Sequence, residues 1–167
     1  MTYLTEILNT YHNRKTFQCG NSILDNYLKI QANQDIKRKL TACFILNDTA
    51  NNNVKAFYTL SNYSIPNKSI PETYRKKFPK SYSSIPTTLL GRLAVDNRFK
   101  GQNLGRLLLI DALKRSYNIS KSIGSFAVIV DPIDNDAINF YTKFGFKMLP
   151  NNGRMFLPMK TIEMLFK

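Results

Sequence analysis

The chain has 167 residues, of which 43% are hydrophobic, and its formal net charge at pH 7 is +13. This length and composition indicate one soluble globular domain, residues 1–167, and no apolar run approaches the roughly 18 residues of a membrane span. The N-terminus lacks the features of a signal peptide, and Cys19 and Cys43 have no metal-type spacing, so we expect a cytoplasmic protein with reduced, structural cysteines.

The first third of the chain predicts a strand followed by a helix. Residues 3–8 have the composition of a short strand, and the turn at 17–21 leads to a helix capped at Asn21 or Ser22. The helical pattern extends to residues 37–39, and its apolar positions recur at helical spacing: Ile23, Leu24, Tyr27, Leu28 and Ile30.

A β-hairpin and a basic insertion follow. Residues 41–46 and 54–65 predict two strands joined by the polar turn 48–53. Residues 67–84 contain two prolines and several basic side chains, and they predict a short helix inside a long insertion.

The second half alternates strands with helices. Strands are predicted at 85–95 and 125–130, and a final strand pair at 146–149 and 154–160. A long helix is predicted at 101–121, and a shorter one lies between a cap at Asp134 and a terminating glycine, Gly145. This alternation predicts an α/β fold with a mixed sheet.

The most informative stretch runs from Leu89 to Arg106, where an apolar strand leads through a glycine-containing turn into a helix. The first N–H groups of a helix have no partner within it, and the helix dipole adds partial positive charge there, so such a turn suits phosphate. Gly101 and Gly105 allow close approach of a ligand, and Lys100 adds full charge. The P-loop and dinucleotide motifs are both absent. We therefore predict a diphosphate-binding turn of another type.

The spacing of Arg98, Gly101 and Asn103 resembles the R/Q-x-x-G-x-G/A motif of the GNAT N-acetyltransferases, which bind acetyl-coenzyme A (acetyl-CoA). Asn103 stands where the family usually has Gly or Ala, and Asn tolerates left-handed backbone angles better than most residues. The segment from Asp134 to Phe146 resembles the family's A-x-x-F-Y-x-x-F/L-G-F motif. The two motifs occur in the family's order and separation.

The resemblance implies the GNAT fold, which is a mixed, mostly antiparallel central sheet flanked by helices, with a splay between the fourth and fifth strands. It also implies acetyl-CoA as co-substrate and no metal. The implied acetyl-CoA contacts are Leu93, Ala94, Val95, Arg98, Lys100, Gly101, Gln102, Asn103, Leu104, Gly105, Arg106, Ala137 and Phe140.

Acetyl transfer to an amine requires a neutral amine, a polarised thioester carbonyl and a proton or other stabilisation for the leaving thiolate. Tyr141 is the expected general acid, because a phenol can donate to a thiolate and the family places a tyrosine there. The alternative is a Tyr141 that only packs. His12 is a weaker candidate, for which the alternative is a surface residue.

Over roughly its whole length the chain also resembles one group within this family, the GNAT toxins of bacterial toxin–antitoxin pairs. These toxins acetylate the amino acid of aminoacyl-tRNA and stop translation. This resemblance rests on the segments 57–61 and 91–95 and on a first-half pattern: Phe17, Cys19, Gly20, Leu24, Asp25, Tyr27, Leu28, Gln31, Ala32, Gln34 and Asp35. It implies a ribbon-helix-helix antitoxin as partner, and the sequence leaves open whether the chain is a homodimer.

The net charge favours nucleic acid as a partner, since a coenzyme A site needs only a few of these charges. The predicted substrate or RNA contacts are Arg92, Gln31, Gln34, Lys37, Arg38, Lys39, Arg75, Lys76 and Lys77. For Arg92 the alternative is a structural ion pair, and for the others it is a solvated surface. Two other functions remain open, namely acetylation of a protein or small amine, and a catalytically inert RNA-binding module.

Overall fold

The computed structural model describes residues 2–167, which form two compact units. The first unit comprises the residues up to Ser61 together with Gly91–Arg115, and the second comprises Asn62–Leu90 and Ser116–Lys167. Seven strands are hydrogen-bonded in the order β1-β2-β3-β4-β5-β7-β6. β4 and β5 are parallel, whereas the pairs β1–β2, β2–β3, β5–β7 and β6–β7 are antiparallel, so the predicted α/β fold with a mixed, mostly antiparallel sheet is confirmed.

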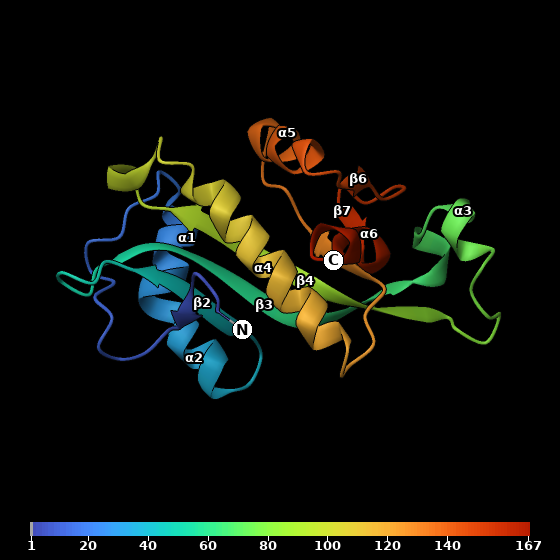
Figure 1. The fold of residues 1–167 in the computed structure, drawn as a ribbon, viewed down its shortest axis with the longest axis horizontal. Helices are drawn as coiled ribbons and strands as arrows, with labels where there is room; N and C mark the ends of the chain where they lie inside the picture. Colours follow the sequence, from blue (N-terminus) through green and yellow to red (C-terminus); the bar gives the residue numbers. More distant parts are fainter. Residues whose placement is uncertain (1) are drawn as a thin grey trace. The chain divides into compact units, whose positions relative to one another are not determined.

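In the first unit, β1 (Glu6–Ile7), β2 (Ala42–Asn47) and the start of β3 (Val54–Pro66) form an antiparallel sheet. The helical segment beside them consists of α1 (Ser22–Asn26), η1 (Tyr27–Gln31) and α2 (Ala32–Lys37), and α2 contacts β2 (Figure 1). The core between them includes Phe17, Tyr27, Leu28, Ala32, Ile45 and Phe57.

The predicted helix after residue 21 begins as expected but is not uniform. The Asn21 side chain accepts hydrogen bonds from the N–H groups of Ile23 and Leu24, which confirms the predicted cap. The next turn, η1, is a π-helix, and the N–H of Ala32 reaches back to the carbonyl of Tyr27. The spacing of apolar residues in the sequence did not reveal this π-helix. A single π-helical turn rotates the apolar face of the helix only slightly.

A buried polar network fixes the part of α4 (Leu104–Ser120) that belongs to the first unit. Tyr58 donates to Asp111 over 2.7 Å, and the Arg115 Nε donates to the Tyr58 hydroxyl over 2.9 Å. The guanidinium of Arg115 also lies 3.8 Å from the ring centre of Tyr3 and 3.9 Å from that of Phe44. These contacts between β3, α4 and the N-terminal segment keep the buried charges paired.

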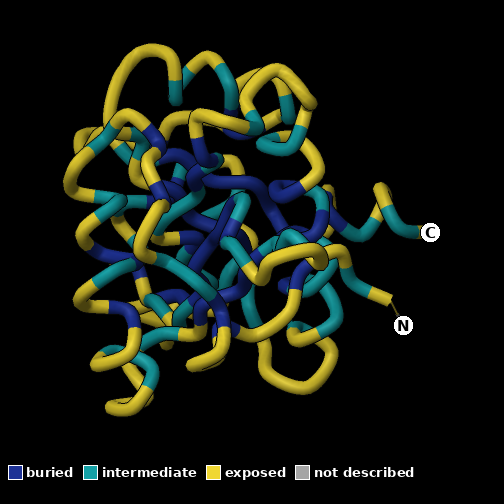
Figure 2. The backbone as a smooth tube through the Cα atoms, turned by 90° about the vertical axis from the view of Figure 1, so that its left-hand side faces the viewer, coloured by how far each residue is buried: buried dark blue, intermediate teal, exposed yellow. Residues whose placement is uncertain are grey.

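The second unit holds β4 (Ser84–Val95) only as far as Leu90, and this part of the strand runs parallel to β5 (Ala127–Val130). In the same unit β5 is antiparallel to β7 (Met155–Pro158), which pairs with β6 (Lys147–Met148). The pairing of β4 with β5 ends at Leu90, whereas β4 itself continues to Val95. All residues of β5 and β7 are buried, whereas those of β1 and β6 are exposed. Figure 2 shows exposed residues along most of the outer bends of the chain.

The remaining helical elements are η2 (Asn67–Ser69), α3 (Glu72–Arg75), η3 (Asn97–Phe99), α5 (Asn135–Lys143) and α6 (Met159–Leu165). The sequence missed α6 and assigned its first residues to a strand. Pro158 ends β7 and precedes α6, whose buried side chains are Met159 and Ile162, a pattern too short to separate from a strand. No helix within residues 2–167 is long and apolar enough to cross a membrane.

The two cysteines are buried and form no disulfide bond within residues 2–167, as expected of reduced, structural cysteines. Burial raises the pKa of Cys19 to about 11 and that of Cys43 to about 12. Both side chains are therefore protonated thiols near neutral pH, which suits a structural role and not a nucleophilic one.

Candidate active site

The turn between β4 and α4, in the first unit, has the backbone that a phosphate-binding turn requires. Gly101 has a φ of 83° and Asn103 a φ of 63°, so both residues are left-handed and α4 begins at Leu104, not at Gly101 as predicted. Asn103 thus adopts the conformation that was expected of it. A Cβ placed on Gly101 would meet no protein atom within 4 Å. The space above Gly101 is open to a ligand.

The charged side chains of this turn are held by the protein itself. The Nε of Arg98 donates to Asp96 Oδ1 over 2.9 Å, and its Nη2 donates to Asp96 Oδ2 over 3.1 Å. The Lys100 ammonium donates to the carbonyl oxygen of Cys19 over 2.7 Å. Arg106, in the first turn of α4, is exposed. The sequence predicted Arg98 and Lys100 as cofactor contacts, and the structure gives both of them contacts that fix the turn.

Asp96 is the residue that organises the turn, and the sequence analysis missed it. Its carboxylate is 1% exposed and also accepts the backbone N–H groups of Gln18 and Arg98, over 3.0 and 2.8 Å. Burial by itself raises the pKa of Asp96, but the hydrogen bonds from Arg98 and Gln18 outweigh it and hold the pKa below its usual value. The available signal was an acidic residue two positions before the motif arginine.

The end of β4 divides its side chains between two faces. Ala94 is buried in the core of the first unit, and Leu93 and Val95 are half-buried. Arg92 is on the same face as Ala94, and its guanidinium carbon lies 3.5 Å from the ring centre of Tyr27. The structural alternative for Arg92 was an ion pair, but the observed contact is a cation–π interaction. Its contact with substrate stays a prediction.

The other predicted substrate residues of the first unit are exposed. Gln31 ends η1 and donates to Asp35 over 3.4 Å, and the side chain of Gln34 accepts from Arg38 over 3.4 Å. Lys37, Arg38 and Lys39 follow at the end of α2, all exposed. These positions fit a surface contact with RNA and equally a solvated helix.

In the second unit, the helix that carries Tyr141 has the predicted ends. The carboxylate of Asp134 accepts the N–H of Ala137 over 2.8 Å, and Gly145 has a φ of 92°. The N–H of Gly145 bonds the Thr142 carbonyl, and the N–H of Phe146 bonds that of Tyr141, which together form a Schellman motif. Both ends of α5 are therefore determined by residues close in sequence.

The Tyr141 side chain is 9% exposed and lies between two rings. The ring centres of Phe140 and Phe146 are each 5.2 Å from its own. Its hydroxyl forms no hydrogen bond within residues 2–167, and burial raises the pKa of this phenol well above its ordinary value. Tyr141 thus keeps its proton across the neutral range, although a raised pKa also makes the phenol a weaker acid, and its role as general acid stays a prediction. Phe140 and Ala137, the other predicted residues of α5, are half-buried.

His12 is not the surface residue that the sequence suggested. It is 3% exposed, its Nδ1 accepts the Asn9 N–H over 2.9 Å, and its Nε2 lies 3.3 Å from Glu6 Oε1. These short-range contacts give the imidazole a structural role. Within residues 2–167 no three His, Cys, Asp or Glu residues gather as a metal site would require.

Comparisons with known proteins agree with the resemblance. The family model described as the acetyltransferase (GNAT) domain matches residues 72–148. A Mycobacterium tuberculosis protein named tRNA-acetylating toxin is 32% identical over 137 residues, which are 82% of this chain and 80% of that protein.

Two solved structures are similar along the whole chain. A structure of AtaT complexed with acetyl-methionyl-tRNAfMet has a TM-score of 0.89 and 30% identity, and the match covers 98% of both chains. A tyrosine-to-phenylalanine mutant of the toxin AtaT, bound to the C-terminus of the antitoxin AtaR and acetyl-CoA, has a TM-score of 0.81 and 27% identity. That match covers 98% of this chain and 97% of the other.

Proposed function

Because the chain belongs to the GNAT acetyltransferase family, we propose that it transfers the acetyl group of acetyl-CoA to the α-amino group of an aminoacyl-tRNA and so blocks translation. The observation that carries this proposal is the likeness to AtaT bound to acetyl-methionyl-tRNAfMet, which extends over 98% of the chain. The two units would then act as one catalytic domain. The activity would be cytoplasmic, where ribosomes use aminoacyl-tRNA.

The β4–α4 turn is the proposed site for the diphosphate of acetyl-CoA. Left-handed backbone at Gly101 and Asn103 directs the chain into α4, whose first N–H groups have no partner within the helix. A Cβ at Gly101 would project into the open space beside the turn, so glycine lets a ligand approach the backbone closely there. Since Arg98 and Lys100 are engaged by Asp96 and Cys19, backbone N–H groups and Arg106 carry the main attraction.

Tyr141 is the proposed proton donor. As the amine nitrogen forms a bond to the thioester carbonyl carbon, the carbon–sulfur bond breaks and the sulfur takes the phenolic proton. The proton that the amine loses then returns to Tyr141 through solvent. A phenol is already protonated near neutral pH, and burial raises the pKa of Tyr141 further, so the donor is present in its protonated form. A backbone N–H of Leu93–Val95 would meet the developing oxyanion.

The α-amino group of an aminoacyl ester suits this site because it is a weak base and is partly neutral near pH 7. The enzyme then needs no strong base, and neither His12 nor a carboxylate cluster provides one within the described residues. The net charge of +13 favours the RNA part of the substrate. Arg92, Gln31, Gln34 and the basic residues 37–39 and 75–77 are the proposed contacts.

We further propose an antitoxin of the ribbon-helix-helix type as the protein partner. The support is that AtaT, a toxin similar to this chain, has been solved with the C-terminus of its antitoxin AtaR. A homodimer is compatible with this assignment.

The proposed function is tested by incubating the protein with labelled acetyl-CoA and total charged tRNA. We expect label in N-acetyl-aminoacyl-tRNA, and digestion of that product identifies the amino acid. Deacylated tRNA is the matched control and should remain unlabelled. Label that appears only in protein or in small amines would reject aminoacyl-tRNA as substrate, and no transfer at all would indicate an inert binding module.

A further inference from the structure

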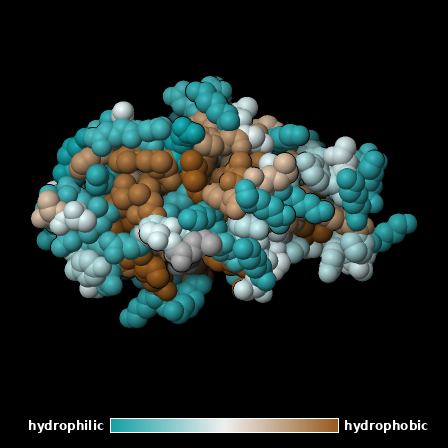
Figure 3. Space-filling model, in the orientation of Figure 1, coloured by the Kyte–Doolittle hydropathy of each residue, from teal (hydrophilic) through white to brown (hydrophobic). Residues whose placement is uncertain are grey.

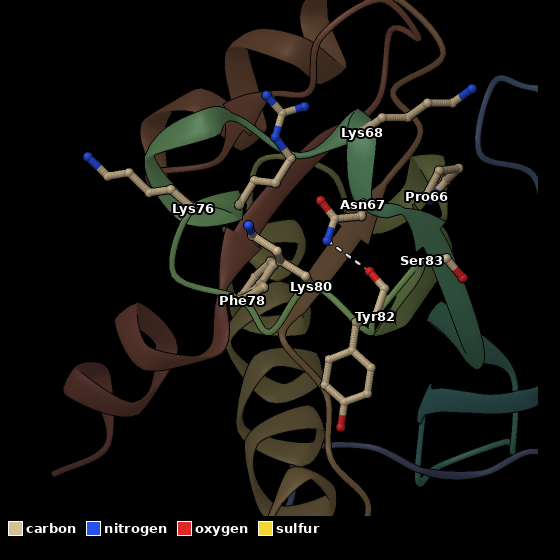
Figure 4. A pocket seen from close by; sticks show the side chains of 9 residues that line it. Pro66, Asn67, Lys68, Lys76, Phe78, Lys80, Tyr82 and Ser83 are labelled. Carbon is tan, nitrogen blue, oxygen red and sulfur yellow. Dashed lines mark hydrogen bonds between the residues drawn. The ribbon is translucent and has the colours of Figure 1, made fainter.

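The basic insertion between β3 and β4 forms a hollow of about 550 Å³ in the second unit. Its lining includes six polar or aromatic side chains: Asn67, Lys68, Arg75, Lys76, Lys80 and Tyr82. Figure 4 shows Lys68 and Lys76 extending to opposite sides, with Asn67 and Lys80 between them. Lys77, which was predicted with Arg75 and Lys76, does not line it.

Aromatic packing holds the insertion in place. Phe78 lies 5.0 Å from the ring of Phe126, edge to face, and Tyr74 lies 5.7 Å from Phe126 and 5.5 Å from Phe156. Such pairs add about 0.5–1.5 kcal/mol each to the burial of the rings. The short helix α3, which carries Tyr74 and Arg75, is therefore anchored to the sheet of the second unit.

The start and the end of the insertion are also joined directly by hydrogen bonds. The backbone N–H of Asn67 donates to the Ser83 carbonyl over 2.9 Å, and its side-chain Nδ2 donates to the Tyr82 carbonyl over 2.9 Å (Figure 4). These bonds join the first residue of η2 to the two residues before β4. The backbone that frames the hollow is thus held by the protein itself, which lowers the cost of ordering it on binding.

Positive charge in the hollow has no internal counterpart. Lys68, Lys76 and Lys80 are exposed and Arg75 is half-buried, and none of the four has an ion pair within residues 2–167. No carboxylate lines the hollow in that part of the chain. The surface around α3 is mainly hydrophilic (Figure 3). Gathered like charges repel one another, so a bound polyanion would stabilise the arrangement.

We propose that this hollow binds the backbone phosphates of an RNA strand, with a base stacked on Tyr82. The ring of Tyr82 is 55% exposed, and a base offers it an aromatic face in addition to the phosphates beside it. An acidic peptide would satisfy the cations but would give the ring no base to stack on. The proposal rests on the proposed function in one respect, namely that the RNA is a tRNA.

The test measures the affinity of the full-length protein for labelled deacylated tRNA by fluorescence anisotropy over a range of salt concentrations. In the double variant Lys68→Ala/Lys80→Ala, the slope of log Kd against log salt should fall by about 1.5, since each lost phosphate contact removes roughly 0.7–0.9. The matched control is Lys147→Ala/Lys160→Ala, which removes two exposed lysines that do not line the hollow. Its slope should remain within about 0.3 of the wild type. Thermal unfolding verifies that both proteins are folded.

Variants of Tyr82 test the stacking part of the proposal independently of the lysines. Tyr82→Ala should weaken tRNA binding by about fivefold or more, whereas Tyr82→Phe keeps the ring and should bind like the wild type. Equal slopes for the hollow and control variants would overturn the proposal. So would a loss of polyglutamate binding with tRNA binding unchanged, which would assign the hollow to an acidic peptide.

Failure of this inference is separate from failure of the proposed function. If the wild type acetylates charged tRNA but the hollow variant binds tRNA like its control, only the hollow inference is rejected. If the hollow variant loses RNA affinity while the wild type acetylates no charged tRNA, the hollow remains an RNA site and the proposed function is rejected.

Discussion

The β4–α4 turn and the hollow of the basic insertion are both rich in cations, yet they use them in opposite ways. In the turn, Arg98 is paired with Asp96, and Lys100 is bonded to the carbonyl of Cys19. In the hollow, Lys68, Arg75, Lys76 and Lys80 have no ion pair within residues 2–167. Basic residues near a phosphate motif therefore do not all face the phosphate.

The difference follows from what each region has to hold. A turn with two left-handed residues is costly unless surrounding contacts fix it, and Asp96 provides those contacts through its side chain. The proposed diphosphate would then be bound by backbone N–H groups, which have a fixed direction. The hollow presents flexible ammonium groups, which suit a ligand with many phosphates and no single required geometry.

The largest effect should come from Asp96→Ala, which removes the support of the turn. Two backbone N–H groups and the Arg98 guanidinium would lose their acceptor, and we expect the free energy of unfolding to fall by about 3 kcal/mol. The melting temperature should then fall by about 10 °C. Asp134→Ala, which removes a single cap bond in the other unit, should cost only about 1 kcal/mol. Equal losses in the two variants would mean that Asp96 does not organise the turn.

The contribution of Asp96 to the free energy of unfolding should depend on pH. Because the folded-state pKa of Asp96 lies below its unfolded value of about 3.9, its stabilisation is fully present above about pH 4. It is lost as the pH falls through the folded pKa. Urea unfolding at pH 7 and pH 3 should show a smaller difference between the wild type and Asp96→Ala at the lower pH. A difference that does not shrink would contradict the ion pair.

Tyr141→Phe should change the catalytic rate without changing the binding of coenzyme A at the turn or of tRNA at the hollow. The ring keeps its contacts with Phe140 and Phe146 while the proton donor is lost, so kcat should fall roughly 10²-fold. Calorimetry with coenzyme A and anisotropy with tRNA should both give affinities near those of the wild type. Near-normal turnover would make Tyr141 a packing residue and water the proton source.

Gly101→Asp should weaken binding of coenzyme A more than tenfold, which corresponds to about 1.4 kcal/mol. The change adds a side chain and a negative charge in the open space at the turn. Gly153→Asp is the matched control, because Gly153 also has a positive φ, 71°, and open space around its Cβ position. Calorimetry should show unchanged affinity for the control. Unchanged affinity in Gly101→Asp would remove the diphosphate from this turn.

The smallest effect should come from the basic residues at the end of α2. Replacing Lys37, Arg38 and Lys39 with Ala should reduce the salt dependence of acetylation of charged tRNA and lower its rate severalfold. Acetylation of a small amine should change little, because it cannot reach these side chains. Equal losses on tRNA and the small amine would favour a folding defect, and no salt dependence in the wild type would count against nucleic acid as substrate.

Short-range features could be predicted from the sequence by itself. The caps at Asn21 and Asp134, the left-handed Asn103 and the Gly145 terminator were all identified, because each depends on residues within a few positions. The alternation of strands and helices likewise gave the fold class. The π-helical turn at Tyr27–Gln31 and the C-terminal helix α6 were missed, since both patterns are too short or too slightly altered to show in the periodicity.

Only the tertiary structure decided which charges are available. Lys100 meets the carbonyl of Cys19, and Arg92 stacks on Tyr27, although each pair is far apart in the sequence. His12 is polar, so its sequence context suggests exposure, but the residues around it in the fold bury it. The insertion becomes a cationic hollow because its aromatic residues pack on Phe126 and Phe156. Motif and backbone conformation are local properties, whereas neutralisation and burial depend on partners that folding brings from elsewhere in the chain.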